Sequence, residues 1–177
     1  MSRGVDAGGD LQVVRGGPER IADLQPLWAA LQAHHAALAP LLVGLTARSI
    51  DESWARRRPR YDEWLAEPDA FVLIAERAGR PIGYALVRVV DGFHSFGPNE
   101  RVGSVETLSV LPAARGAGAG TALMDAAERE LARIGVRELK LAVVAGNDEA
   151  LRFYARRGLN AVSHTLVGRI DDRPRAR

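Results

Sequence analysis

The sequence predicts an α+β fold that is built around one central sheet. Most strands of this sheet are antiparallel, and one β-α-β step is parallel. Three observations predict this fold. The apolar residues change their spacing several times along the chain, between the alternation of strands and the repeat of helices. Two early strands are separated only by Ala78-Gly79-Arg80-Pro81, and so short a turn requires antiparallel pairing. A later strand–helix–strand step is long enough for a crossover between parallel strands.

The first half of the chain predicts one strand, two helices and then a hairpin. Gly16 and Gly17 end the first strand, and Pro18 suits the first turn of a helix, where no backbone N–H is needed. Pro40 ends this helix, and we expect Pro59 to interrupt the next one. The expected elements are a strand at 11–14, helices at 18–39 and 49–66, strands at 71–76 and 82–90, and a loop at 91–101.

The second half predicts strands that alternate with helices. Leu123, Ala127, Leu131 and Ile134 lie on one stripe of an amphipathic helix. The expected elements are strands at 103–111 and 139–143, helices at 121–134 and 147–157, and a last strand region at 159–170. We expect one domain over residues 10–170, with disordered tails at 1–9 and 171–177.

Composition and charge exclude several classes of protein. The chain has 177 residues, of which 47% are apolar, and its 24 basic and 22 acidic residues give a net charge of +2. Such a composition is typical of a globular protein, and the small net charge argues against a dedicated nucleic-acid-binding protein. The absence of cysteine excludes disulfide scaffolds, thiolate metal sites and cysteine nucleophiles. No secretory signal is visible and the longest apolar stretch, at 38–45, is too short to span a membrane, so we expect a cytoplasmic protein.

The most informative segment is the glycine-rich turn, residues 115–121, which lies between an expected strand and an expected helix. Small residues allow a ligand to approach the backbone, and the free N–H groups of a helix's first turn form an anion site suited to pyrophosphate. A P-loop would need a lysine between Gly120 and Thr121, and a dinucleotide fingerprint would need glycine where Thr121 stands. Without further signals, a flexible linker or a tight turn remains the alternative.

Two motifs together resemble a known family. Arg115-x-x-Gly118-x-Gly120 is similar to the acetyl-coenzyme A (acetyl-CoA) signature of the GNAT superfamily of N-acetyltransferases. The segment from Asn147 to Gly158 resembles the family's Asn-x-x-Ala-x-x-Phe-Tyr-x-x-x-Gly, with Leu159 where the family usually has phenylalanine. The resemblance covers residues 70–170 and implies helices on both faces of a twisted sheet.

The resemblance implies acetyl-CoA as cosubstrate and transfer of its acetyl group to a primary amine of a small molecule or peptide. Because the chain has no cysteine, direct attack by the amine is the simpler mechanism. The alternative is a non-catalytic acyl-CoA sensor or interaction module on the same fold. The residues implied to bind the cosubstrate are Leu108, Val110, Arg115, Gly116, Ala117, Gly118, Ala119, Gly120, Thr121 and Asn147.

Two residues are candidates for acid–base catalysis. The resemblance assigns Tyr154 the role of general acid toward the departing thiolate; the alternative is a core aromatic residue. Glu106, in an otherwise apolar strand, is the candidate base; the alternative is a solvent-facing or ion-paired glutamate. With strict alternation, Glu106 shares a face with Leu108 and Val110.

The acceptor site is less defined by the sequence. An amine pocket uses aromatic and acidic side chains, although most of the aromatic candidates are expected to be packing residues. The arginine cluster 56–60 is expected to be a solvated helix face, or else to favour an acidic acceptor. A homodimer is implied by the resemblance alone. The aromatic candidates are His34, His35, Trp54, Tyr61, Trp64, Phe93, His94 and Phe96, and the acids nearby are Asp51, Glu52, Asp62 and Glu63.

Overall fold

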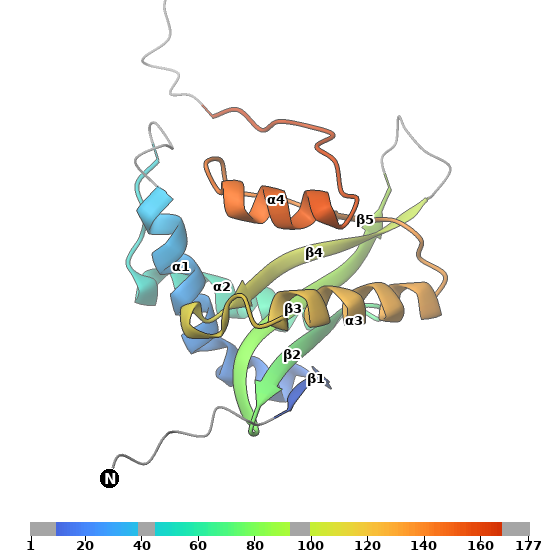
Figure 1. Cartoon of the computed structure of the whole chain (residues 1–177), viewed down its shortest axis with the longest axis horizontal. Helices are drawn as coiled ribbons and strands as arrows, with labels where there is room; N and C mark the ends of the chain where they lie inside the picture. Colours follow the sequence, from blue (N-terminus) through green and yellow to red (C-terminus); the bar gives the residue numbers. More distant parts are fainter. Residues whose placement is uncertain (1–9, 39–44, 93–99, 168–177) are drawn as a thin grey trace, which may run out of the picture. The chain divides into compact units, whose positions relative to one another are not determined.

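A five-stranded mixed sheet is the framework of the chain, in a computed structural model that describes residues 10–38, 45–92 and 100–167 (Figure 1). The strands follow one another in the order β1-β2-β3-β4-β5. All pairs are antiparallel except β4 with β5, which is parallel, so the predicted fold class is confirmed. The strands are β1 (Leu11–Gly16), β2 (Phe71–Arg77), β3 (Arg80–Asp91), β4 (Arg101–Val110) and β5 (Leu139–Leu141).

The chain divides into two compact units, which are described separately. Residues up to 33 and residues 49–142 form the first unit, which contains the whole sheet. Residues 34–48 and the segment from 143 onward form the second. The expected single domain over 10–170 stays a prediction, and the two expected tails lie outside the described residues.

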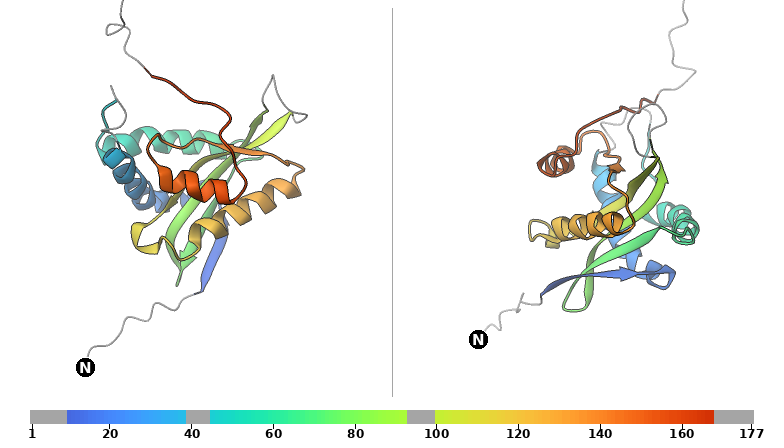
Figure 2. Two further views of the ribbon diagram at one scale, coloured as in Figure 1. Left: turned by 45° about the horizontal axis from the view of Figure 1, so that its top comes forward. Right: turned by 90° about the vertical axis from the view of Figure 1, so that its right-hand side faces the viewer.

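Helices cover both faces of the sheet in the first unit (Figure 2). On one face lie α2 (Ile50–Leu65), the 3-10 helix η1 (Pro18–Leu24) and the first part of α1 (Gln25–Leu38). Their aromatic and aliphatic side chains bury a core against β2 and β3, made of Ile21, Leu24, Leu27, Trp28, Trp54, Tyr61, Trp64, Val72, Ile74, Tyr84 and Leu86. On the other face, α3 (Ala119–Arg133) buries Leu123, Ala127 and Leu131 of its predicted apolar stripe, whereas Ile134 follows the helix and is half-buried.

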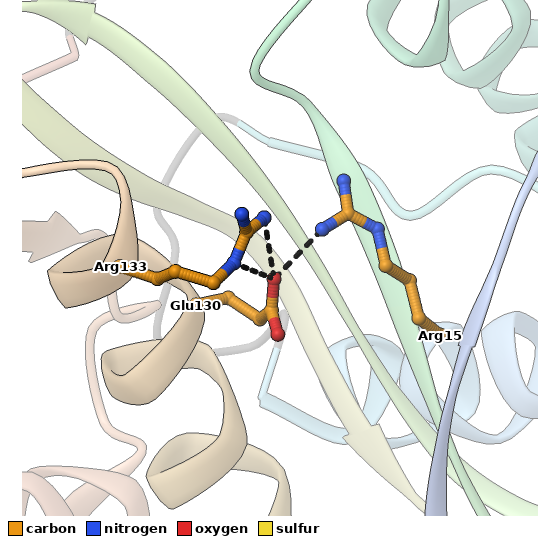
Figure 3. Close-up of polar contacts among 3 residues, drawn as sticks. All are labelled: Arg15, Glu130 and Arg133. Atoms are coloured by element: carbon orange, nitrogen blue, oxygen red, sulfur yellow. Dashed lines mark hydrogen bonds and ion pairs between the residues drawn. The ribbon is translucent and has the colours of Figure 1, made fainter.

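Two local devices fix α3 on its face of the sheet. A side chain at Gly103 would collide with Leu131 of α3, so the missing Cβ lets the helix approach β4 closely. At the surface, Glu130 of α3 accepts hydrogen bonds from Arg15 of β1 at 2.8 Å and from Arg133 at 3.2 Å (Figure 3). The exposed ion pairs contribute little free energy, about 0–1 kcal/mol.

Two sequence-based expectations are wrong. Helix α2 runs uninterrupted through Pro59, because Pro59 and Ala55 are exposed and water can satisfy the carbonyl that proline leaves unbonded. The helix also starts firmly, with a capping box between Ser49 and Glu52. The expected last strand is absent from residues 159–167, where no ladder partner holds the chain extended; residues 168–170 lie outside the described part.

The remaining elements agree with the prediction within a few residues. The hairpin turn consists of Ala78 and Gly79 alone, both with positive φ, so β3 begins at Arg80. The last helix is α4 (Asp148–Arg156), in the second unit. No helix in the described ranges has the length and apolar character needed to cross a membrane.

Candidate functional site

The glycine-rich turn connects the end of β4 to the start of α3 through a short 3-10 helix, η3 (Pro112–Ala114). Gly116 and Gly118 both have left-handed φ, 74° and 84°, which non-glycine residues rarely adopt. Gly118 is the N-cap of α3, and the first helical bond runs from Ala122 N to Gly118 O at 2.9 Å. The N–H groups of the first helical turn therefore have no acceptor within the helix and are available to an anion.

Arg115 places a cation at the edge of this turn. Its side chain is exposed, and its Nε donates to the Val110 carbonyl at 3.3 Å, which holds the guanidinium near the end of β4. The residues 116–118 are exposed too, whereas Ala119 is buried. The turn thus presents backbone donors, a fixed positive charge and almost no side-chain bulk to solvent.

A bulge in β4 decides where Glu106 points. Thr107 pairs with Leu86 and Val105 pairs with Val87, so Glu106 is an extra residue without a partner on β3. Beyond a bulge the alternation of faces is offset by one residue. The sequence contains no signal from which this bulge could be predicted.

Alternation along β4 is therefore not strict, and Glu106 does not share a face with Leu108 and Val110. Glu106 contacts Arg88 and Thr107 contacts Tyr61, so both side chains lie on the α2 face. Leu108 pairs with Ala85 of β3, Ala85 pairs with Leu73 of β2, and Leu73 pairs with Arg15 of β1. Paired residues lie on the same face of a sheet, and Arg15 contacts Glu130 of α3. Leu108 and Val110 consequently lie on the opposite, α3 face.

Glu106 belongs to an ion cluster with Arg88 and Glu67. Arg88 Nη1 lies 3.4 Å from Glu106 Oε1, and Arg88 binds both oxygens of Glu67, through Nε at 2.9 Å and Nη2 at 2.6 Å. The hydrogen bond with Glu67 is the main cause that raises the pKa of Arg88. The guanidinium also lies over the ring of Trp64, 5.1 Å from its centroid. Glu106 is thus an ion-paired glutamate, as the alternative to a catalytic base expected.

A buried chain of hydroxyl groups lies beside this cluster. Tyr61 OH lies 2.8 Å from both Tyr84 OH and Thr107 Oγ1, which links α2, β3 and β4. Ser109 Oγ, two residues further along β4, donates to the Leu27 carbonyl at 2.8 Å. Burial raises the pKa of Tyr61 and of Tyr84, so both phenols stay neutral. These bonds hold β4 to the helices just after the bulge.

The aromatic acceptor candidates divide by location. Trp54, Tyr61 and Trp64 are buried in the core, where they pack edge-on or tilted against one another. His34 and His35 lie in the second unit, with ring centroids 6.1 Å apart. Three further candidates lie outside the described residues: Phe93, His94 and Phe96.

The acidic candidates and the arginine cluster are mostly exposed. Asp51, Glu52, Asp62 and Glu63 are all exposed, and Glu52 serves the capping box of α2. Arg56, Arg58 and Arg60 are exposed and form the expected solvated face of the helix. Arg57 is partly buried and stacks on Trp28, 4.5 Å from the ring centroid.

The second unit carries the remaining two candidates on α4. Asn147 is the N-cap of this helix, and its Oδ1 accepts from Ala150 N at 3.2 Å, as its structural role requires. Tyr154 is partly buried and packs edge-on against Phe153 at 5.1 Å. Burial raises the pKa of Tyr154 to about 12, so its phenol keeps its proton across the ordinary pH range.

Sequence reasoning missed Glu67 and Arg88. Arg88 is the one charged residue in the expected strand 82–90, and a charge within an apolar strand is a usable signal. Glu67 follows α2 in a stretch with several acidic residues, where nothing in the sequence distinguishes it. Among the residues that the structure describes, no group of three or more histidine and acidic side chains is placed to hold a metal ion.

Comparison with protein families identifies the relatives of this chain. The model of the acetyltransferase (GNAT) family matches residues 35–159, more than half of the chain. The chain belongs to the GNAT acetyltransferase family. The resemblance seen in the sequence is therefore confirmed, and the matched range includes Glu106, the glycine-rich turn and α4.

Curated relatives of this GNAT chain carry the names of acetyltransferases. The mycothiol acetyltransferase of Amycolatopsis mediterranei is 39% identical over 102 residues, which cover 58% of this chain and 32% of that protein. That of Streptomyces bingchenggensis is 32% identical over 143 residues, covering 81% and 40%. An uncharacterized N-acetyltransferase of Mycobacterium tuberculosis is 33% identical over 99 residues, covering 56% and 58%. The chain thus spans about a third to two fifths of the length of these two mycothiol acetyltransferases.

Solved structures show the same GNAT fold. An aminoglycoside N-acetyltransferase in complex with CoA has a TM-score of 0.68 at 18% identity, covering 93% of this chain and 97% of that one. A GCN5-related N-acetyltransferase from Ralstonia eutropha has a TM-score of 0.66 at 20% identity, covering 90% and 98%. At these identities the likeness concerns the fold.

Acetyl-CoA fits the family and the chemistry of the turn. The pyrophosphate of CoA is an anion, and the turn offers helix N-terminal N–H groups, two left-handed glycines and Arg115. The neighbouring edge of β4 is suited to an extended ligand arm as well. β5 pairs with β4 only from Gly103 to Val105, so among the described residues this edge has no strand partner from Glu106 onward.

Proposed function

We propose that this chain is an acetyl-CoA-dependent N-acetyltransferase that moves the acetyl group directly to a primary amine of a small molecule or peptide. The observation that carries the proposal is the left-handed glycine turn at the N-terminus of α3, in a chain of the GNAT family. The names of its relatives, mycothiol acetyltransferase and N-acetyltransferase, support acyl transfer.

In the proposed complex the cosubstrate lies along β4 and the turn. Backbone groups of Leu108 and Val110 bind the pantetheine arm, because this part of β4 has an edge without a strand partner in the described chain. The N–H groups of 116–121 hold the pyrophosphate, and Arg115 adds a charge-assisted hydrogen bond. Asn147, already the cap of α4, contacts the arm with its remaining hydrogen-bonding capacity.

The proposed chemistry needs a base, an acid and close placement of the reactants. Glu106 takes the proton of the attacking amine, directly or through water, and its contact with Arg88 leaves its second carboxylate oxygen for this task. Tyr154 donates its proton to the departing thiolate, and with a pKa of about 12 the phenol is protonated whenever the amine is ready to react. Holding amine and thioester together supplies much of the remaining rate enhancement.

The direct test is turnover of acetyl-CoA by the purified chain with a panel of primary amines, read as release of free CoA thiol. The panel contains amino sugars, polyamines, amino acids and a peptide with a free N-terminus. We expect acetylated product with at least one class. CoA binding without turnover of any amine would instead favour the non-catalytic acyl-CoA-binding alternative, and no CoA binding would contradict both. The expected cytoplasmic location and the homodimer stay predictions.

A further inference from the structure

We propose that Arg57 and Ser53 of α2 form a binding site for a carboxylate of the acceptor, so that the preferred substrates are amines that also carry a carboxyl group. The inference rests on the proposed function in one respect, that an amine is the acceptor. It names the class of that amine and makes Arg57 a residue that determines specificity. The contacts of Arg57 and Ser53 themselves do not depend on the reaction.

Arg57 lies on the side of α2 that faces the core, although it is charged. Trp54, Tyr61 and Trp64 bury this side of the helix, and Arg57 stands three residues after Trp54 and four before Tyr61. Its side chain is partly buried, whereas the other arginines of the cluster are exposed. Its position in the sequence thus directs this one guanidinium inward, toward the aromatic side chains.

Aromatic rings surround the Arg57 guanidinium, and no acid neutralises it. Its central carbon lies 4.5 Å from the ring centroid of Trp28, 5.6 Å from that of Trp64 and 5.8 Å from that of Tyr61. Within the described ranges no carboxylate forms an ion pair with it. Rings cover the face of a guanidinium, but the N–H groups at its edge still need acceptors. A partly buried cation of this kind favours the binding of an anion.

Ser53 adds a neutral donor one helical turn before Arg57. Its Oγ accepts a hydrogen bond from the indole Nε1–H of Trp28 at 3.1 Å, and the same Trp28 ring lies under the Arg57 guanidinium. This bond leaves the O–H group of Ser53, which has no acceptor among the residues that the structure describes. Residues four apart lie on the same side of a helix, so hydroxyl and guanidinium are placed to bind one carboxylate together.

The site lies on the same face of the sheet as Glu106. Burial is the main cause that raises the pKa of Tyr61; of the charges nearby, Arg57 lowers that pKa and Glu106 raises it. Trp64 gives a second link, since Arg57 and Arg88 lie 5.6 Å and 5.1 Å from its ring centroid and Arg88 contacts Glu106. We therefore expect one small molecule to reach Glu106 with its amine and Arg57 with its carboxylate.

Three guanidinium groups lie over the ring of Trp64, and their charges are not balanced. Arg88 has the two acidic partners described above. Arg57 and Arg60 have no ion pair within the described part of the chain. A carboxylate on the acceptor brings this cluster closer to neutrality. Because Arg60 is exposed and well solvated, the partly buried Arg57 gains more from an anionic partner.

The experiment measures how strongly each variant prefers an acid over the matching amide. The substrates are ω-amino acids of increasing chain length, from glycine upward, each paired with its carboxamide. The ratio of kcat/KM for acid and amide is taken within one variant, so a change in the amount of folded protein cancels. We expect R57Q to lower this ratio about 10-fold or more for the best acid, because a charge-assisted hydrogen bond is lost. R57K, which keeps the charge without the planar fork, lies between, and S53A lowers the ratio less than R57Q.

The chain offers a matched control in Arg60, which lies on the same helix and over the same Trp64 ring but is exposed. R60Q should keep the parent's ratio. A second readout needs no turnover: the NMR signal of the Trp28 indole N–H during titration with N-acetyl-β-alanine or its carboxamide. We expect the acid to shift this signal in the parent and in R60Q but not in R57Q, and the amide to shift it in none of them.

The outcomes separate this inference from the proposed function. Equal ratios in the parent and R57Q, or an equal fall in R57Q and R60Q, would overturn the carboxylate site. If no amine is acetylated, the proposed function fails and the Trp28 signal alone decides. A shift by the acid that R57Q abolishes then supports the site, and no shift in the parent contradicts it.

Discussion

At the scale of single residues, the backbone conformation of the glycine-rich turn requires glycine at positions 116 and 118, whereas the room for a side chain does not. A methyl group at Gly116 or Gly118 would meet nothing within 4 Å, so neither glycine is needed to avoid a collision. Their φ angles of 74° and 84° are the reason, because a side chain there is strained by about 1–2 kcal/mol. The turn is built to hold its N–H groups in one orientation.

We therefore expect G118A to weaken CoA binding and to lower the free energy of unfolding by about 1–2 kcal/mol. Gly135, after α3, provides the control, since it also has a left-handed φ, 80°, and open space around its Cα. G135A should lose similar stability and keep the parent's Kd for CoA, measured by calorimetry. Equal Kd values in both variants would place the pyrophosphate elsewhere.

The role proposed for Tyr154 depends on one atom, its hydroxyl oxygen. Y154F keeps the ring contact with Phe153 and removes only the hydroxyl. We expect kcat to fall by about 10²–10⁴, as for the loss of a general acid, with little change in the Kd for CoA. A pKa of about 12 also means that no loss of kcat from ionisation of this phenol occurs near neutral pH. An unchanged kcat in Y154F would assign the residue to packing.

At the scale of elements, α2 shows how packing overrides a local signal. Pro59 predicts an interruption, yet Trp54, Tyr61 and Trp64 bury one side of the helix and hold it intact. The same helix contributes Tyr61 to the hydroxyl chain that fixes β4 next to the bulge. The continuity of α2 through Pro59 is therefore one of the conditions for the position of Glu106.

Because Pro59 still leaves one helical hydrogen bond unmade, we expect P59A to stabilise the chain. Helix propensity favours alanine by about 3 kcal/mol, and the greater freedom of the unfolded chain offsets up to about 1 kcal/mol, so a gain of about 2 kcal/mol follows. P68A, in the turn after α2, restores no helical bond and serves as the control in denaturant unfolding. A loss of stability in P59A would show that the proline has a structural task.

At the scale of the whole molecule, ligand binding and unfolding are linked. If CoA binds the folded state and not the unfolded state, a CoA concentration of 100 times the Kd raises the free energy of unfolding by about 2.7 kcal/mol. Thermal unfolding with increasing CoA measures this rise. In G118A the same CoA concentration should give a smaller increase, and an increase equal to the parent's would contradict a site at the turn.

The sequence by itself determined the order of the elements up to α4, the hairpin, the glycine-rich turn and the family motifs. Each of these depends on spacing within a short segment, where periodicity, turn residues and capping act locally. It did not determine the interactions of Glu106, because the face of this side chain depends on whether alternation along β4 is strict, and the bulge interrupts it.

The tertiary structure alone decided that face, through one unpaired residue in the register of β3 and β4. It also brought together Glu67, Arg88 and Glu106, which lie on three separate segments of the chain, and placed Arg57 against the core aromatics. The physical reason is the same in each case. Strand register and side-chain pairing arise from contacts between distant segments. Local sequence patterns do not show which of many sterically allowed pairings buries the most surface and satisfies the most polar groups.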